Sequence, residues 1–148
     1  MMKIKEILEG KKTELYTAKE SSSLCEAMAT MLDKHVSALL VMNGSELEGI
    51  ISEKDVMKIC HISSKGPAEL KVKDFMTPKD KLITCGTNDT IESLMVLMTE
   101  KRIRHIPVIA NGSVEGVVSI GDVIKNLLDA AKKDNKLLMD YISGTYPH

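Results

Sequence analysis

The sequence is poor in aromatic residues, with no tryptophan, one phenylalanine and three tyrosines among 148 residues. Proteins that bind single-stranded nucleic acid stack its bases on several aromatic side chains, and this chain has too few for such a platform. The 20 Lys and Arg residues are balanced by 21 Asp and Glu residues, leaving a net charge of −1. No basic field therefore attracts nucleic acid, and we expect no nucleic-acid partner.

Long apolar runs are also absent, and none approaches the roughly 20 residues that a membrane-spanning helix needs. The first ten residues, MMKIKEILEG, alternate charged and apolar residues and lack the apolar core of a signal peptide. The three cysteines, Cys25, Cys60 and Cys85, are odd in number and have no CxxC spacing. These features predict a protein of the reducing cytoplasm with no membrane partner.

Catalytic motifs are missing as well. The sequence contains no G-x-S-x-G nucleophile motif, no P-loop and no dinucleotide-binding glycine fingerprint. Its four histidines and three cysteines do not have the spacing of metal ligands. We therefore expect no catalytic residues, no catalytic cofactor and no metal site.

What the sequence does contain is an internal repeat, the first feature to look for in a new chain. A shift of 67 positions aligns residues 15–42 with 82–109 and residues 47–59 with 114–126. The Asn-Gly pairs at 43–44 and 111–112 are 68 positions apart, which we interpret as a slip in the alignment. We predict a first repeat at residues 1–65, a second at 66–130, and a C-terminal helical extension and tail at 131–148.

Each repeat has the pattern β-α-β-β-α. A leading segment (4-IKEIL-8 or 72-VKDFM-76) precedes a brief strand near Leu15–Thr17 or Leu82–Thr84. Apolar residues at helical spacing then predict helices at Leu24–Lys34 and Ile91–Lys101. The pattern predicts a mixed α/β (α+β) protein with small sheets flanked by helices.

The remaining elements follow from capping and turn residues. Ser23 and Glu26 have the spacing of a capping box. In both repeats two apolar strands flank Asn-Gly, which predicts a hairpin because this dipeptide tolerates positive φ. A final helix is expected to begin after Ser52 in the first repeat and after Ser119 in the second.

The last helix of the second repeat should be longer than that of the first. An apolar stripe runs through residues 122–142, is interrupted by the polar residues 132–136, and is followed by Gly144 and Pro147, which suit a helix end. Three interpretations are open: a flap on the chain's own core, a dimerisation element, or a helix that binds a partner.

Both repeats end in the motif Gly-apolar-apolar-Ser-x-x-Asp, at 49-GIISEKD-55 and 116-GVVSIGD-122. Helix capping alone explains Ser and Asp at this spacing. The same groups also suit a ligand, because a helix N-terminus binds anions and an Asp can accept bonds from both hydroxyls of a ribose. Gly49 and Gly116, which lack a Cβ, would let that ligand approach the strand closely.

Together with 72-VKDFMTP-78 and 103-IRHIPVI-109, these motifs resemble a tandem pair of cystathionine-β-synthase (CBS) domains, a Bateman module. The resemblance covers residues 4 to about 130 and is closest to small stand-alone CBS-pair proteins. One departure is Leu40, which stands where the second repeat has Pro107.

The resemblance implies two repeats related by a pseudo-twofold axis, with adenosine nucleotides such as AMP, ADP, ATP or NAD bound in clefts between them. In such pairs the Asp holds the ribose and the Ser adds a contact, which here implicates Ser52, Asp55, Ser119 and Asp122. Arg104 and His105 occupy phosphate-contacting positions, and Lys54 is a weaker candidate. By the family's symmetry the Asp55 cleft would be completed by Ile83, Thr84, Arg104 and His105, and the Asp122 cleft by Tyr16, Thr17, Ser37 and Ala38. The Asp55 cleft is therefore expected to be the more basic one and to take the phosphate.

The family further implies a regulatory protein that forms a homodimer and acts on a separate, unidentified partner protein. The main alternative is a ligand-independent interaction module in which the Ser-x-x-Asp motifs are only caps. Sensing of a metal ion or haem is a third, weaker alternative.

Overall fold

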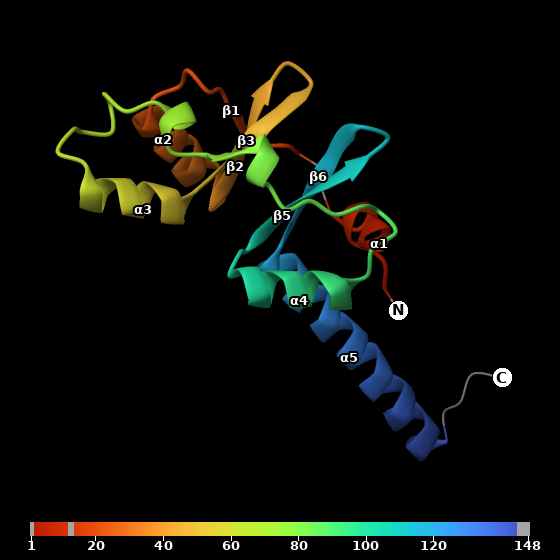
Figure 1. The fold of residues 1–148 in the computed structure, drawn as a ribbon. Helices are drawn as coiled ribbons and strands as arrows, with labels where there is room; N and C mark the ends of the chain where they lie inside the picture. Colours follow the sequence, from red (N-terminus) through yellow and green to blue (C-terminus); the bar gives the residue numbers. More distant parts are fainter. Residues whose placement is uncertain (1, 12–13, 145–148) are drawn as a thin grey trace. The chain divides into compact units, whose positions relative to one another are not determined.

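The computed structural model describes residues 2–11 and 14–144 (Figure 1). Mixed α and β elements alternate along the chain, as the sequence predicts. The helices are α1 (Ile4–Glu9), α2 (Leu24–Lys34), α3 (Glu53–Ile62), α4 (Ile91–Lys101) and α5 (Ile120–Ser143). The strands are β1 (Thr17–Ala18), β2 (Ala38–Asn43), β3 (Glu46–Ser52), β4 (Thr77–Pro78), β5 (His105–Ala110) and β6 (Ser113–Ser119), and two short 3-10 helices are η1 (Val72–Asp74) and η2 (Lys79–Lys81).

The described residues fall into two compact units that do not coincide with the sequence repeats. The first, here called the α5 unit, contains those within residues 1–12, 87–106 and 118–148. The second, here called the sheet unit, contains those within residues 13–86 and 107–117.

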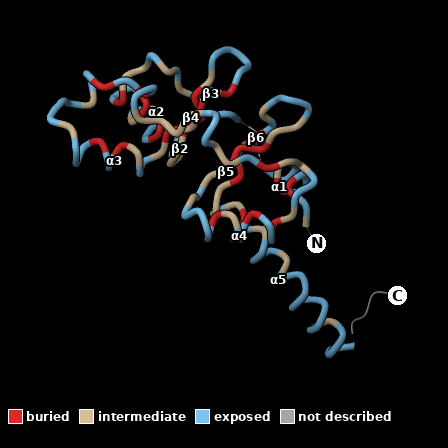
Figure 2. The backbone as a smooth tube through the Cα atoms, in the orientation of Figure 1, coloured by how far each residue is buried: buried red, intermediate tan, exposed pale blue. Residues whose placement is uncertain are grey.

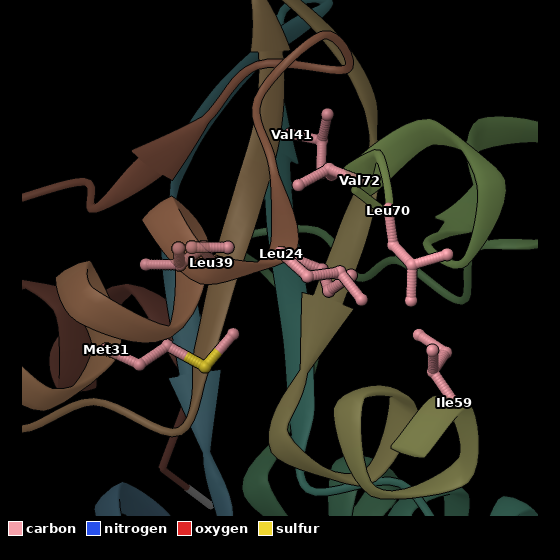
Figure 3. Close-up of a cluster of buried hydrophobic side chains, with 9 residues drawn as sticks. Leu24, Met31, Leu39, Val41, Ile59, Leu70 and Val72 are labelled. Atoms are coloured by element: carbon pink, nitrogen blue, oxygen red, sulfur yellow. The ribbon is translucent and has the colours of Figure 1, made fainter. Parts of the chain in front are cut away.

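The sheet unit is built on a four-stranded sheet in the order β1-β2-β3-β4. β1 runs parallel to β2, and the β2–β3 and β3–β4 pairs are antiparallel. Leu39 and Val41 of β2 pack with Leu24 and Met31 of α2 and with Ile59 of α3 (Figure 3). Because Leu40 is also buried, β2 is an inner strand enclosed on both faces.

Leu70 and Val72, from the leading segment of the second repeat, belong to this same core (Figure 3). The segment is held at the start of α2: Leu24 donates its N–H to the Leu70 carbonyl (2.9 Å), and Val72 donates to the Ser22 carbonyl (2.9 Å). The second repeat therefore supplies part of the core that closes around the helices of the first.

The α5 unit shows the reciprocal arrangement at the start of α4. Ile4 of α1 donates its N–H to the Asp89 carbonyl (2.9 Å), and Lys5 donates to the Thr87 carbonyl (3.0 Å). Lys3 forms an isolated antiparallel bridge with Thr90, the N-cap of α4, just as Lys71 does with Ser23, the N-cap of α2. The two repeats have exchanged their leading segments.

Both predicted hairpins form, and the second turns at its Asn-Gly pair as expected, but the first does not. β2 ends at Asn43 and β3 begins at Glu46, so the turn residues are Gly44 and Ser45, with φ of 60° at Gly44. In the second hairpin the turn residues are Asn111 and Gly112, with φ of 51° and 77°. The strands themselves keep a constant shift of 67 positions, so the predicted alignment slip is wrong: Asn-Gly simply occupies different turn positions.

The two predicted amphipathic helices form at the expected residues, whereas one predicted strand is almost absent. The helices predicted at Leu24–Lys34 and Ile91–Lys101 are confirmed at both ends. Ser23 accepts the Glu26 N–H (3.1 Å), which is half of the predicted capping box. The strand predicted near Leu82–Thr84 is reduced to a single parallel bridge between Cys85 and Val108.

Helix α5 is one continuous helix that ends at Ser143 and is capped by Gly144, one of the two predicted stop signals, in the left-handed conformation that glycine adopts readily. Pro147, the second predicted stop signal, lies outside the described residues. Most of the helix surface is exposed (Figure 2), including Leu137, Leu138 and Ile142. The described part of α5 therefore does not fold back as a flap on the core of its own unit. Among the described residues, no helix is long and apolar enough to cross a membrane.

The sheet unit gives Gly49 a different role from the predicted one. In the β3–β4 pairing, Gly49 lies opposite Pro78 and Ile50 lies opposite Thr77. A Cβ on Gly49 would collide with the Thr77 backbone carbonyl oxygen and press on the Met76 sulfur. The space that we expected a ligand to use is filled by the chain's own strand β4, and the ligand-access explanation of Gly49 is corrected accordingly.

We predict that Gly49→Ala destabilises the protein by about 1–3 kcal/mol, as over-packing against a rigid backbone usually does. The measurement is the free energy of unfolding in urea. Gly66→Ala is the matched control, because a Cβ at Gly66 meets nothing within 4 Å. Equal stabilities for the two variants would contradict the assigned contact.

Candidate functional site

The two Ser-x-x-Asp motifs form the junctions between a strand and the helix that follows it. At the end of β3, Ser52 donates its N–H to Asp55 Oδ2 (2.9 Å), and its Oγ accepts the Asp55 N–H (3.4 Å). At the end of β6, Ser119 makes the same two bonds with Asp122, at 2.9 and 3.2 Å. Both motifs are therefore reciprocal capping boxes, which fix each carboxylate over the first turn of its helix.

The carboxylates use only one of their two oxygens for this structural role. Asp55 Oδ2 also accepts the Ser52 hydroxyl (3.0 Å), and Asp122 Oδ2 accepts all of the side-chain bonds that the structure gives Asp122. Within the described residues, no hydrogen bond reaches Oδ1 of either residue. Because a carboxylate oxygen has two lone pairs, each Oδ1 is chemically able to accept hydroxyl groups.

In the sheet unit, two predicted site residues lie at the Ser52 junction and two more lie on the neighbouring strand pair. Ala38 is the register partner of Ser52, and the Ser37 carbonyl accepts the Glu53 N–H (3.0 Å) at the start of α3. Thr17 pairs with Leu40 two residue pairs further along, and the Tyr16 carbonyl accepts the Leu40 N–H (3.1 Å). Ser37 and Ala38 are thus neighbours of their own repeat's motif, whereas Tyr16 and Thr17 lie beside β2 on the side away from β3.

In the α5 unit, Arg104 lies at the Ser119 junction. Its carbonyl accepts the Ile120 N–H (2.9 Å) at the start of α5, which parallels the bond between Ser37 and Glu53. His105 follows as the first residue of β5 and is half-buried. Gly116 is buried within β6, while Lys54 is exposed in the first turn of α3.

The prediction that Arg104 and His105 complete a cleft at Asp55 stays a prediction, as does the one that assigns Tyr16, Thr17, Ser37 and Ala38 to Asp122. Ile83 and Thr84 precede the Cys85 bridge in the unit that also contains Asp55. Their assignment to the Asp55 cleft likewise stays a prediction.

Lys11 is a site residue that sequence reasoning missed. Its Nζ lies 2.7 Å from Asp122 Oδ2, in an ion pair between residues 111 positions apart. The exchange of leading segments explains how Lys11 reaches Asp122. Helix α1 contacts α5, and Lys11 lies two residues after the end of α1. A lysine after a short helix gives no local signal of such a partner, and only the exchange itself could have revealed it.

This ion pair places a cation at Asp122 that the sequence did not predict. The Lys11 ammonium group contacts the Asp122 carboxylate, and the backbone carbonyl of Arg104 lies at the same junction. Within the described residues of the sheet unit, Asp55 forms no ion pair. The expectation that the Asp55 cleft is the more basic one stays a prediction.

The environment of Asp122 also changes its acidity. Burial of the carboxyl acts to raise its pKa, but the hydrogen bond from Lys11, the backbone N–H of Ser119 and the charge of Lys11 outweigh burial. The net effect lowers the pKa of Asp122 below its ordinary value of 3.8. At neutral pH the group is an ionised acceptor.

Metal ligation has no counterpart in the described part of the chain, where no three His, Cys, Asp or Glu residues gather closely enough to hold an ion.

The lowered pKa of Asp122 predicts a pH dependence of stability. A carboxyl with a depressed folded-state pKa stabilises the fold above its unfolded pKa of about 3.9, and this contribution is lost as pH falls through the folded-state pKa. Asp122→Asn should lower the free energy of unfolding at pH 7 by about 1 kcal/mol, the typical value of a helix cap. It should also weaken the decline in stability below pH 4, measured by urea unfolding at pH 7 and pH 3.

Asp129→Asn, at an exposed position on the same helix, serves as the control and should leave the pH dependence almost unchanged. Parallel stability curves for wild type and Asp122→Asn would contradict the ion pair as the cause.

Comparison with known proteins agrees with this architecture. The family model for the CBS domain matches residues 4–62 and 72–129. The chain is 37% identical over 124 residues to the CBS domain-containing protein CBSX3, mitochondrial, of Arabidopsis thaliana, and the match covers 82% of the chain and 60% of that relative. It thus spans somewhat more than half the length of this relative.

Solved structures show the same fold. The CBS domain protein NE2398 superposes with a TM-score of 0.82 at 34% identity, covering 86% of this chain and 99% of that one. CBSX2 in complex with AMP has a TM-score of 0.71 at 22% identity, covering 83% and 96%. The CBS pair of MJ0100, in complex with 5′-methylthioadenosine and S-adenosyl-L-methionine, has a TM-score of 0.74 at 22% identity, covering 88% and 98%. The repeated capping-box junctions and these matches together place the chain in the CBS domain family, as a tandem pair of CBS domains.

Proposed function

We propose that this chain is a regulatory module that binds adenosine-containing nucleotides at its Ser-x-x-Asp junctions and modulates a separate partner protein. The observation that carries the proposal is that the two carboxylate oxygens of Asp55, and likewise of Asp122, have different roles. Each uses Oδ2 to cap its helix and keeps Oδ1 without a hydrogen bond in the described structure. Capping and ligand binding are therefore compatible uses of one residue.

The chemistry of the junction suits a ribose. Two neighbouring hydroxyls of a ribose can donate to one ionised carboxylate, and the adjacent Ser hydroxyl offers one more contact. CBSX2 and the MJ0100 pair, which share the fold, were solved with AMP, 5′-methylthioadenosine or S-adenosyl-L-methionine, all of which contain adenosine. The likeness supports AMP, ADP, ATP or NAD as regulatory ligand candidates for this chain.

The charge distribution supports Asp122 as the better place for a phosphate-bearing ligand. The Lys11 ammonium group contacts its carboxylate, and Arg104 lies where the strand-to-helix turn begins, with its backbone carbonyl bonded to Ile120. The N-terminus of the 24-residue helix α5 adds a partial positive charge at the same point. Lys11 and this helix N-terminus belong to one unit. Within the described residues of the sheet unit, Asp55 has the N-terminus of α3 and the neighbouring Lys54 but forms no ion pair.

Regulation would follow from differential binding. A nucleotide that prefers one arrangement of the CBS pair shifts the population toward that arrangement, and a partner that recognises it responds. We propose no catalytic activity, because the junction residues serve to hold and not to transform a ligand. Cytoplasmic location remains part of the proposal and rests on cysteine usage.

A ligand-independent interaction module is the second candidate. The capping boxes account fully for Ser52, Asp55, Ser119 and Asp122 as structural residues, and Lys11 already neutralises Asp122. This candidate is distinguished from the first by whether any adenosine compound binds.

The test is calorimetric titration with AMP, ADP, ATP, NAD and S-adenosylmethionine, supported by thermal unfolding. Ligand at 100 times its dissociation constant should stabilise the protein by about 2.7 kcal/mol. Asp122→Ala should weaken binding of a phosphate-bearing ligand by about 10- to 100-fold, since a hydrogen bond to a charged group contributes roughly 1.5–3 kcal/mol.

Asp55→Ala and Asp129→Ala are run beside it, the latter as a control for loss of charge on α5. A loss confined to Asp55→Ala would overturn the assignment to Asp122. The absence of binding by every compound would instead favour the interaction module.

A further inference from the structure

Helix α5 has two faces with different surroundings. Val123 is buried, and Asn126 and Ala130 are partly buried, on the side that packs within the α5 unit, where α5 contacts α1 and α4. A second side stays exposed over almost the whole helix (Figure 2). It carries the seam Ile124, Leu127, Ala131, Asp134, Leu138 and Tyr141, whose exposed fractions reach 60% at Leu138 and 70% at Tyr141.

The seam has the spacing of a coiled coil. Its residues follow one another at alternating intervals of three and four positions, from 124 to 141. This is the a/d repeat that keeps one stripe of a helix against a partner helix. Leu128 and Leu137, also exposed, lie along its edges.

We propose that this seam pairs with the same seam of a second copy of the chain, in antiparallel orientation. Placing residues whose numbers add to 265 opposite one another aligns Ile124 with Tyr141, Leu127 with Leu138, and Ala131 with Asp134. In this register Leu128 and Leu137 lie at the same level, on opposite flanks of the seam. Every large apolar side chain meets another large one, and the small Ala131 faces the only charged residue of the seam.

Charge selects this orientation over the parallel one. In a parallel pair Asp134 would face Asp134 of the second copy across the seam, and two like charges in a helix interface repel. In the antiparallel pair each Asp134 lies opposite an alanine, which leaves room for its carboxylate to stay hydrated. A single polar residue at a seam position commonly fixes register and orientation in this way.

The size of the seam suits a reversible dimer. Seven large apolar residues lie on the seam or along its edges and are between 38% and 76% exposed: Ile124, Leu127, Leu128, Leu137, Leu138, Tyr141 and Ile142. At roughly 60–120 Å² for a leucine-sized side chain, two copies would bury on the order of 1,000 Å². This lies near the lower limit for a specific interface, so we expect dissociation in the micromolar range.

The test is sedimentation velocity of the full chain from about 1 to 200 micromolar. Wild type should shift from monomer to dimer, and Leu138→Lys should raise the dissociation constant at least tenfold. Met139→Lys is the matched control, because Met139 is 60% exposed like Leu138 but lies off the seam. Lysine is a good helix former, and circular dichroism verifies that both variants keep the fold.

Orientation is tested by disulfide mapping of Leu127→Cys/Leu138→Cys in a chain that also carries Cys25→Ser and Cys60→Ser. The two new cysteines are about 16 Å apart on one helix and cannot bridge within a chain. Oxidised glutathione accepts the electrons as the bond forms, and peptide mass spectrometry should find residue 127 joined to residue 138. Bonds joining 127 to 127 would overturn the antiparallel register. A wild type that stays monomeric throughout, or a dimer unaffected by Leu138→Lys, would overturn the proposed interface.

Discussion

The reciprocal bond between a serine and an aspartate at each strand-to-helix junction is the interaction on which the rest of the molecule depends. It ends β3 and β6, begins α3 and α5, and orients the two carboxylates. The backbone reinforces it, because Ser37 and Arg104 each accept the N–H of the first residue of the following helix. The junction thereby joins the residue before the first strand of each hairpin to the residue after its second strand. Any ligand chemistry at these aspartates uses a geometry that the fold already requires.

Local signals in the sequence were sufficient for the helices α2 and α4 and for the N-caps of α3 and α5. Apolar periodicity located α2 and α4 to the residue, and Ser52 and Ser119 were identifiable as N-caps from their spacing to an acidic residue. The turn residues were less certain, because Asn-Gly suits more than one position of a two-residue turn and only strand register decides between them. Gly49 illustrates the same limit. Its sequence context cannot show that the atom it makes room for belongs to Thr77.

The exchange of leading segments escaped prediction for a different reason. The apolar residues of segments 4–9 and 70–76 would suit the core of either repeat. The sequence of each segment therefore does not show which core it completes. Lys11 follows from that choice: once α1 packs within the α5 unit, the lysine reaches Asp122 and adds a cation that the sequence did not predict at that site. Site chemistry that depends on distant segments is thus the least accessible from sequence alone.

The exchanged segments also set the order in which the chain can become native during synthesis. Residues 70–72 emerge from the ribosome well after α2, so the core around Leu24 stays incomplete until roughly half of the chain has been made. Helix α1 can make its native contacts only later, because Ile4 bonds to Asp89, 85 positions downstream. Contacts of such separation close long loops and slow folding. Helix α1, although synthesised first, is therefore among the last elements to form its native contacts.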